Sequence, residues 1–299
     1  MKPLRLGIIG NTSKPMVAKL LPEFLGWLNA EGISFIVAAD LAPVLDLKPE
    51  EYKPAEALAG DVDFVLSFGG DGTFLQTAAC IAPRETPIIG VNLGGLGYLA
   101  DVGVEDLRLK IHQLQCGEYR VQERAMLEGL IASKKDRFVG LNDIVIEKGG
   151  FPRTIRLDCL IDGQFLNTFH ADGLIVSTPT GSTGYSLSVG GPILDPDVDV
   201  LVLNPISPHM LANRPLVING SRRVDITAFA ESGEFQITAD GQKIARSKSG
   251  TKVTIRRADF KTKIVLFGDY SFHAVLRNKL HWRDQFSESG ESIEAGSCR

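Results

Sequence analysis

The sequence predicts an α/β N-terminal domain with a mostly parallel sheet, followed by a mainly antiparallel all-β C-terminal domain. In the first hundred residues, short runs rich in Ile, Val and Leu alternate with helix-like segments, which is the order of a parallel sheet with helical connections. From about residue 120, β-branched runs are separated by turn pairs such as Asp162-Gly163 and Asp240-Gly241, as in antiparallel sheets. A length of 299 residues suits two domains.

Four apolar runs predict the buried strands of the first domain, at residues 4–9, 33–38, 63–68 and 87–92. Between the first two strands, apolar side chains recur at helical spacing from Val17 to Leu28, and Gly32 is placed to end that helix. Pro22 lies within the pattern, so we expect either a kink or a later start of the helix.

The second half reads as a series of β-branched strands, and the end of the chain has few apolar residues, which is typical of a disordered tail. We therefore divide the chain into residues 1–102 (α/β domain, with a turn of sequence GGDGT at 69–73), 103–266 (all-β domain), 267–285 (C-terminal segment) and 286–299 (disordered tail).

Composition excludes several classes of protein. A net charge of −4 argues against a nucleic-acid or membrane-surface binder. The four cysteines are far apart without a CxxC pair, and the five histidines show no HExxH spacing, so we expect reduced thiols and no protein-bound metal. The first apolar run is too short for a signal peptide and no 18-residue apolar stretch occurs, which favours a cytoplasmic enzyme.

The sequence GGDGT at residues 69–73 follows the strand predicted at 63–68 and precedes a helix that we expect to open at Thr73. Ligands of parallel sheets bind beyond the carboxyl ends of the strands, where glycines permit close approach and a helix start offers N–H groups to an anion. This predicts a phosphate site beside Asp71. A tight turn with a solvated aspartate is the alternative, since the motif is neither a Walker A loop nor GxGxxG.

The stretch DGLIVSTPTGSTGYSLSVGGPI at residues 172–193 is more informative. From Ser177 to Ser188, hydroxyl residues alternate with glycines and no residue is charged. Many donors with little bulk suit a ribose or a pyrophosphate, although a Ser/Thr/Gly-rich surface loop is the alternative.

Polar residues elsewhere are weaker candidates. His170 and Asp172 border the glycine-rich stretch. Asn142-Asp143 precedes an apolar run. The Asn142 amide is suited to hydrogen bond the edge of an adenine base, and ordinary turn chemistry is the alternative. His209 lies in a proline-rich segment that predicts a rigid bend, and we do not expect it to be a catalyst.

Together these motifs resemble the NAD kinase family. The resemblance rests on GGDGT at 69–73, LND at 141–143, the stretch at 172–188, SPHMLANRP at 207–215 and DGQ at 240–242, in that order. It implies ATP-dependent phosphorylation, with Mg²⁺ or another divalent cation, of the adenosine ribose 2′-hydroxyl of NAD to give NADP. It also implies a homodimer or homotetramer, a dinucleotide-binding β domain, and a C-terminal segment that returns to the first domain.

The resemblance implies a role for particular residues. Asp71 corresponds to the base that faces the 2′-hydroxyl. The positions that correspond to ligand contacts are Gly69, Gly70, Asp71, Gly72, Thr73, Asn142, Asp143, Arg153, His170, Asp172, Thr183, Gly184, Tyr185, Ser186, Leu187, Ser188 and Gln242.

Two other functions share part of the pattern. A lipid kinase of the diacylglycerol type also carries GGDGT, but it predicts an apolar groove and membrane recruitment that this sequence does not suggest. A non-catalytic dinucleotide sensor would be expected to lose the base, whereas Asp71 is present. The sequence leaves open the use of NADH or polyphosphate, the size of the oligomer, contacts from a neighbouring subunit and feedback by NADP(H).

Overall fold

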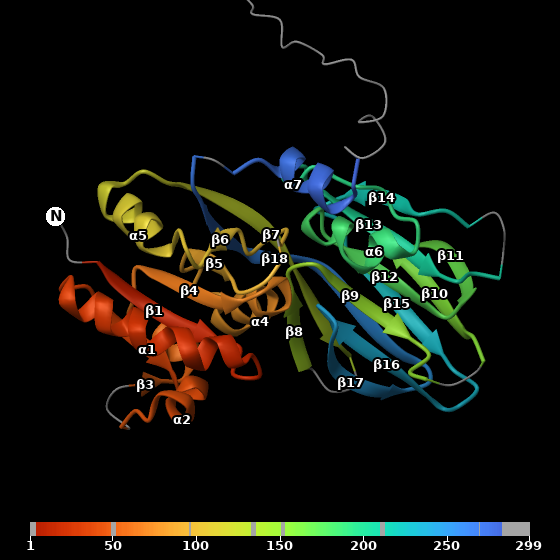
Figure 1. Cartoon of the computed structure of the whole chain (residues 1–299). Coiled ribbons are helices and arrows are strands. Elements are labelled where there is room, and N and C mark those ends of the chain that lie inside the picture. Colours follow the sequence, from red (N-terminus) through yellow and green to blue (C-terminus); the bar gives the residue numbers. More distant parts are fainter. Residues whose placement is uncertain are drawn as a thin grey trace, which may run out of the picture.

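The computed structural model describes residues 4–48, 52–95, 97–132, 136–150, 153–209, 213–268 and 270–282. It has the predicted fold class: a parallel α/β domain and a domain of antiparallel strands (Figure 1). The expectation for residues 286–299 lies outside the described residues. No helix within the described ranges is long and apolar enough to cross a membrane.

Four parallel strands of the first domain lie close to the predicted ranges, and two short strands in its described residues were not expected. They are ordered β3-β2-β1-β4-β5, with β6 beside β5. Their bounds are β1 Arg5–Gly10, β2 Ser34–Ala38, β3 Tyr52–Lys53, β4 Phe64–Gly69, β5 Ile88–Asn92 and β6 Val102–Gly103. Apolar residues on both faces of β2, β4 and β5 are buried, and Leu6 and Ile8 of β1 are fully buried, which explains why these four strands read as continuous apolar runs.

Helices cover both faces of this sheet. They are α1 Pro15–Ala30, α2 Ala42–Leu45, α3 Ala55–Leu58, α4 Asp71–Ile81 and α5 Leu107–Cys116, with a 3₁₀ turn, η1, at Ala39–Leu41. The apolar stripe of α1 packs with α5 on one face, and α3 and α4 pack on the other. Helix α1 begins at Pro15 and continues through Pro22, so the expectation of a later start is wrong. Proline is well tolerated at a first helical position because that N–H has no helical partner.

The second domain pairs a six-stranded antiparallel sheet, ordered β14-β13-β12-β9-β16-β17, with antiparallel strands of the larger sheet. The strands are β7 Arg120–Ile131, β8 Asp136–Gly140, β9 Asp143–Glu147, β10 Ile155–Ile161, β11 Gln164–Ala171, β12 Gly173–Ser177, β13 Val200–Ile206, β14 Leu216–Asn219, β15 Val224–Phe229, β16 Glu234–Ala239, β17 Gln242–Lys248 and β18 Thr251–Leu266. A large apolar core contains residues of both layers.

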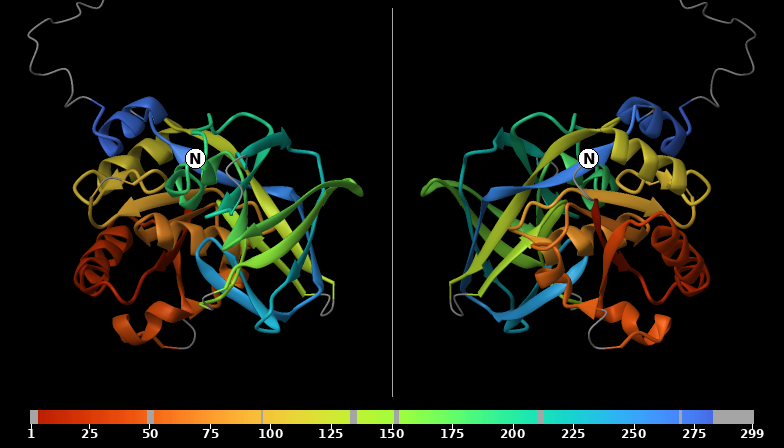
Figure 2. Two further views of the ribbon diagram at one scale, coloured as in Figure 1. Left: turned by 90° about the vertical axis from the view of Figure 1, so that its right-hand side faces the viewer. Right: turned by 90° about the vertical axis from the view of Figure 1, so that its left-hand side faces the viewer.

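Strand β18 connects the two domains. Along its 16 residues it pairs with β15 and β7 in antiparallel fashion, and near its end it runs parallel to β5 through Ile264 and Ile88. One continuous sheet therefore reaches from β11 to β3. Helix α7 (Phe272–Lys279) follows, and the Lys279 Nζ lies 5.6 Å from the centroid of the Tyr98 ring in the first domain. The side views in Figure 2 show both domains and α7.

Candidate active site

Three loops meet at the carboxyl edge of the parallel strands, where the sequence places the GGDGT turn. They follow β1, β4 and β5. The Asn11 N–H donates to the Phe68 carbonyl at 3.0 Å, and the Leu93 N–H donates to the Gly69 carbonyl at 2.9 Å. These bonds hold the loop after β1 and the loop after β5 against the end of β4.

The GGDGT turn leads directly into α4, which begins at Asp71 and not at Thr73 as expected. Gly70 precedes the helix in an extended conformation, so Asp71 occupies the first helical position, where a negative charge is favourable. Gly69 is required for space, because a Cβ there would lie under 3.0 Å from the Thr73 side chain.

The Asp71 carboxylate is fixed by the loop after β5. Its Oδ2 accepts the Tyr98 N–H at 2.9 Å, and its Oδ1 accepts the N–H groups of Leu99 and Ala100 at 2.9 and 3.1 Å. A carboxylate has about four acceptor positions, so one position on Oδ2 remains for another donor. The loop approaches closely because residue 97 is glycine, and a Cβ there would lie 3.0 Å from the Asp71 Cγ and closer still to Oδ1.

A second group of polar residues surrounds the turn before β9. The Asp240 carboxylate accepts the N–H groups of Leu141, Asn142 and Asp143 at 2.7, 2.7 and 3.1 Å. The Asn142 Oδ1 is buried and has no hydrogen-bond partner within the described residues. A buried carbonyl oxygen without a donor is costly, so this atom is suited to accept a hydrogen bond from a ligand.

Burial also acts on the carboxyl group of Asp143. The pKa of Asp143 is raised to about 7 by desolvation and by the neighbouring Asp240. Burial raises the pKa of Asp240 as well, but the three N–H groups that it accepts oppose that shift. The negative charge of the pair is therefore better stabilised on Asp240 than on Asp143.

The glycine-rich stretch folds against this same turn. It forms η3 (Thr180–Thr183) and a short helix, α6 (Tyr185–Ser188). The Thr178 N–H donates to the Asn142 carbonyl at 2.9 Å, and a Cβ at Gly181 would overlap that carbonyl. A Cβ at Gly184 would lie 3.2 Å from the Asn142 Nδ2. Asn142 and Gly184, both expected at ligand-contact positions, are therefore side by side.

Many hydroxyl groups of this stretch bind protein backbone. The Ser182 Oγ donates to the Pro179 carbonyl of the stretch itself, and the Thr178 Oγ1 donates to the Leu141 carbonyl of the turn before β9, both at 2.6 Å. Ser186 is fully buried, and its Oγ lies 3.3 Å from the Nδ2 of Asn204. From Ser177 to Ser188, the accessible residues are Thr183, Gly184, Tyr185, Leu187 and Ser188. The absence of charge thus reflects burial as well as any ligand.

A third group of polar residues lies at the end of β9 and β12 that is remote from Asp143. The register of these strands pairs Ser177 with Asp143 at one end and Gly173 with Glu147 at the other. At ~3.3 Å per residue, the two ends of the strand pair are about 13 Å apart. Here the Lys148 Nζ donates to the Asp172 Oδ1 at 2.7 Å. Tyr185 lies between the groups: its pKa is raised by burial and then by Glu147, Asp172 and Asp143.

The remaining predicted residues lie toward the surface. Arg153 is exposed and forms an ion pair with Glu231. His170 is exposed at the end of β11, where its carbonyl accepts the His209 N–H at 2.9 Å. Gln242 is exposed at the start of β17, two residues after Asp240. None of the three has a described contact with Asp71.

An apolar cluster brings the first two groups together. Phe74 and Leu75 of α4 and Leu99 of the Asp71-binding loop share this cluster with Leu141, which immediately precedes Asn142. Asp71 and Asn142 therefore lie on the borders of one core that joins the two domains.

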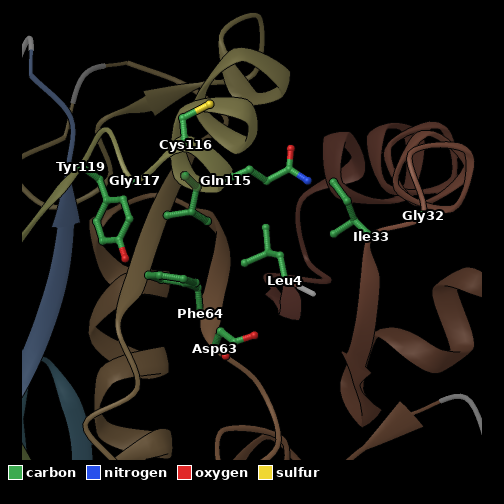
Figure 3. Close-up of a pocket in the computed structure, with 10 residues that line it drawn as sticks. Leu4, Gly32, Ile33, Asp63, Phe64, Gln115, Cys116, Gly117 and Tyr119 are labelled. Atoms are coloured by element: carbon green, nitrogen blue, oxygen red, sulfur yellow. The ribbon is translucent and has the colours of Figure 1, made fainter. Parts of the chain in front are cut away.

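A hollow of about 620 Å³ lies elsewhere, at the amino edge of the same sheet (Figure 3). Leu4, Ile33 and Phe64 line it where β1, β2 and β4 begin, and Tyr119 closes one side. Since α4 starts at the opposite, carboxyl edge, we do not assign this hollow to the reaction.

Sequence reasoning missed several residues around Asp71 and Asn142. Asp240 was noted only in a turn pair and as part of DGQ, and its contacts span 97 to 99 positions. Gly97 and Lys148 were not singled out. Lys14 was also missed, although NTSKP directly after an apolar strand is a signal that could have drawn attention to it.

The comparisons with known proteins agree with the motifs. Residues 6–119 match the ATP-NAD kinase N-terminal domain, and residues 141–267 match the ATP-NAD kinase C-terminal domain. The chain belongs to the NAD kinase family. The resemblance predicted from the five motifs is thereby confirmed.

Curated relatives match over nearly the whole chain. The NAD kinase of Moorella thermoacetica is 37% identical over 278 residues, which cover 92% of this chain and 89% of the relative. The NAD kinase of Syntrophotalea carbinolica is 37% identical over 284 residues, covering 94% and 99%.

Solved structures share the fold. A yeast NADH kinase complexed with NADH has a TM-score of 0.81 at 23% identity and covers 99% of this chain and 91% of its own. An NAD kinase from Archaeoglobus fulgidus in complex with ATP has a TM-score of 0.72 at 24% identity, covering 93% and 99%.

Proposed function

We propose that this NAD kinase transfers the γ-phosphoryl group of ATP to the 2′-hydroxyl of the adenosine ribose of NAD, with Asp71 as the base. The observation that carries the assignment is the Asp71 carboxylate. Three backbone N–H groups fix it and leave one acceptor position on Oδ2. When the 2′-hydroxyl donates a hydrogen bond to this position, Asp71 takes its proton as the hydroxyl oxygen attacks phosphorus. A base placed in this way raises the rate about 10²–10⁴-fold.

The dinucleotide is held, in this proposal, between the GGDGT turn and the turn at Asn142. The unpartnered Asn142 Oδ1 accepts an N–H or O–H of NAD, and the exposed Tyr185 covers the ligand from α6. Asp172 accepts from a dinucleotide hydroxyl while Lys148 holds its carboxylate in place. The apolar cluster shared by the two domains keeps the two turns in register.

The metal accompanies ATP in this proposal. Within the described part of the chain, no cluster of three or more His, Cys, Asp or Glu side chains is arranged to hold a metal ion. Mg²⁺ in phosphoryl-transfer sites is commonly bound through phosphate oxygens, water and one or two carboxylates, and this arrangement suits the residues present. The ion then offsets charge on the transferring phosphoryl group.

The proposal extends to assembly and location. We expect a homodimer or homotetramer. The third polar group, Lys148 and Asp172, lies about 13 Å along β9 from Asp143. We expect a dinucleotide that binds this group to contact a neighbouring subunit as well. Cys80, Cys116 and Cys159 are free thiols, which suits a reducing cytoplasm.

The test measures NADP directly. The purified chain is incubated with ATP, Mg²⁺ and NAD, and NADP is read with an NADP-specific dehydrogenase. We expect turnover by the wild type. The control variant Asp106→Asn should also turn over, because the Asp106 carboxylate is exposed and caps no N–H group. A protein that binds NAD but makes no NADP would support the sensor alternative. Phosphorylation of diacylglycerol in place of NAD would support the lipid-kinase alternative.

A further inference from the structure

We propose that Lys14 binds the phosphate groups of the nucleotide donor, so that the loop after β1 forms one wall of the donor site. The inference rests on the proposed function and assigns a donor-binding role to a residue outside the GGDGT turn. The sequence NTSKP at residues 11–15 places this lysine in the loop directly after β1.

The loop after β1 has little freedom. The Asn11 N–H is bound to the Phe68 carbonyl at the end of β4, and the Lys14 N–H donates to the Asn11 carbonyl at 3.0 Å. The Asn11 Oδ1 accepts the Ser13 N–H at 2.9 Å. Pro15 then restricts Lys14 to an extended conformation, observed as φ −95° and ψ 115°. These constraints fix the backbone from which the Lys14 side chain projects.

The Lys14 side chain reaches the GGDGT turn. A Cβ built on Gly70 would lie 3.7 Å from the Lys14 Nζ, and no other heavy atom would lie within 4 Å of it outside the adjacent residues. The ammonium group and the backbone of Gly70 thus face each other across a small open space. A phosphate oxygen fits between them, within hydrogen-bonding reach of the ammonium group.

The charge of Lys14 has no partner in the described protein. Lys14 is half-buried, and no carboxylate within the described residues forms an ion pair with it. The nearby Asp71 carboxylate is directed at the N–H groups of residues 98–100 instead. Holding a partly desolvated ammonium group without a counter-charge is unfavourable. An anion that enters this space removes the cost.

The triphosphate of the donor is that anion. In phosphoryl transfer, catalysis depends on positioning the donor and offsetting the charge on its oxygens. Lys14 supplies the positive charge from one side, while the N–H groups at the start of the 11-residue helix α4 supply partial positive charge from the other. Asp71 lies in the first turn of the same helix, so a phosphate held by Lys14 is adjacent to the base.

The test compares two lysines of one segment. Lys14→Met removes the charge beside Gly70, and Lys19→Met is the control, because Lys19 is exposed on α1. Lys14→Met should raise the KM for ATP on the order of 10- to 100-fold, the range for loss of a charged hydrogen bond, while the KM for NAD stays within about twofold. Lys14→Arg should recover part of the loss. Calorimetry with inorganic tripolyphosphate should show about tenfold weaker binding to Lys14→Met and unchanged binding to Lys19→Met.

The tripolyphosphate measurement keeps this inference separate from the proposed function. It needs no turnover, so it tests Lys14 even if the wild type makes no NADP. Equal tripolyphosphate affinity of Lys14→Met and Lys19→Met, with both folded by circular dichroism, would overturn the assignment. Equal increases of the KM for ATP and for NAD would also overturn it, because a donor-site cation acts on one substrate.

Discussion

Replacing Gly97 with alanine tests whether the position of Asp71 governs the rate. The new Cβ would lie 3.0 Å from both the Asp71 Cγ and the Ala100 carbonyl oxygen, and closer still to Oδ1. A contact as close as the one to Oδ1 is essentially never seen for real Cβ atoms, so either the carboxylate or the loop must move. Neither is the end of a long flexible side chain, because three N–H groups hold the carboxylate to that same loop.

The expected size follows from the geometry. Relieving the overlap displaces the Asp71 carboxylate by about 1 Å, and a misplacement of that size costs about 10²-fold in rate. Gly97→Ala should therefore lower kcat about a hundredfold. Affinities for NAD and ATP should change little, since Gly97 approaches Asp71 and not the turn at Asn142. The matched control is Gly95→Ala, where a Cβ would meet nothing within 4 Å.

The assay is the coupled measurement of NADP formation, with calorimetric titration of NAD and thermal unfolding of each variant. A folded Gly97→Ala protein with kcat within threefold of the wild type would show that the placement of Asp71 is not critical. Gly95→Ala as inactive as Gly97→Ala would refute the argument too, because it would attribute the effect to loop stiffness.

Two further predictions concern the carboxyl groups. Asp71→Asn keeps Oδ1 for its two donors but sets an NH₂ group against the Tyr98 N–H, so kcat should fall at least about a hundredfold while the Kd for NAD stays within a few-fold; a kcat within about threefold of the wild type would make Asp71 an orienting group. For Asp143, the raised pKa of about 7 means that between about pH 4 and 7 the folded protein retains a proton that the unfolded chain has lost. Stability should fall as pH rises through that window, by at most about 1.4 kcal/mol per pH unit. Asp143→Asn should remove this part of the slope in urea unfolding between pH 5 and 8, and identical slopes would disprove the assignment.

The sequence alone determined the fold class and the edge of the sheet where the chemistry lies. Strands buried on both faces need apolar side chains at nearly every position, so β1, β2, β4 and β5 were readable as continuous runs. The parallel order then placed GGDGT at the carboxyl edge, because strands joined by helices all end on the same side. Glycines and a single carboxylate in five consecutive residues carry their chemistry locally, and this is why the motif was recognisable without coordinates.

Local signals were weaker at element boundaries and for side-chain direction. The start of α4 was expected at Thr73 but lies at Asp71. A glycine before a helix does not specify which residue takes the first helical position, so tertiary contacts decide where the helix starts. Hydroxyl groups in the 177–188 stretch were expected to face a ligand, yet several bind the backbone of their own segment. Their residue type specifies donors and acceptors but not the direction in which they point.

Only the tertiary structure decided which distant residues complete the site. The loop of Leu99 and Ala100 reaches Asp71 from 28 and 29 positions away, and Asp240 holds the Asn142 turn from 98 positions away. Propensity and periodicity act over a few residues, whereas these contacts depend on strands pairing across the sheets and on the core that joins both domains. The direction of the Lys14 side chain belongs to the same class, because the end of β4 fixes the loop that carries it.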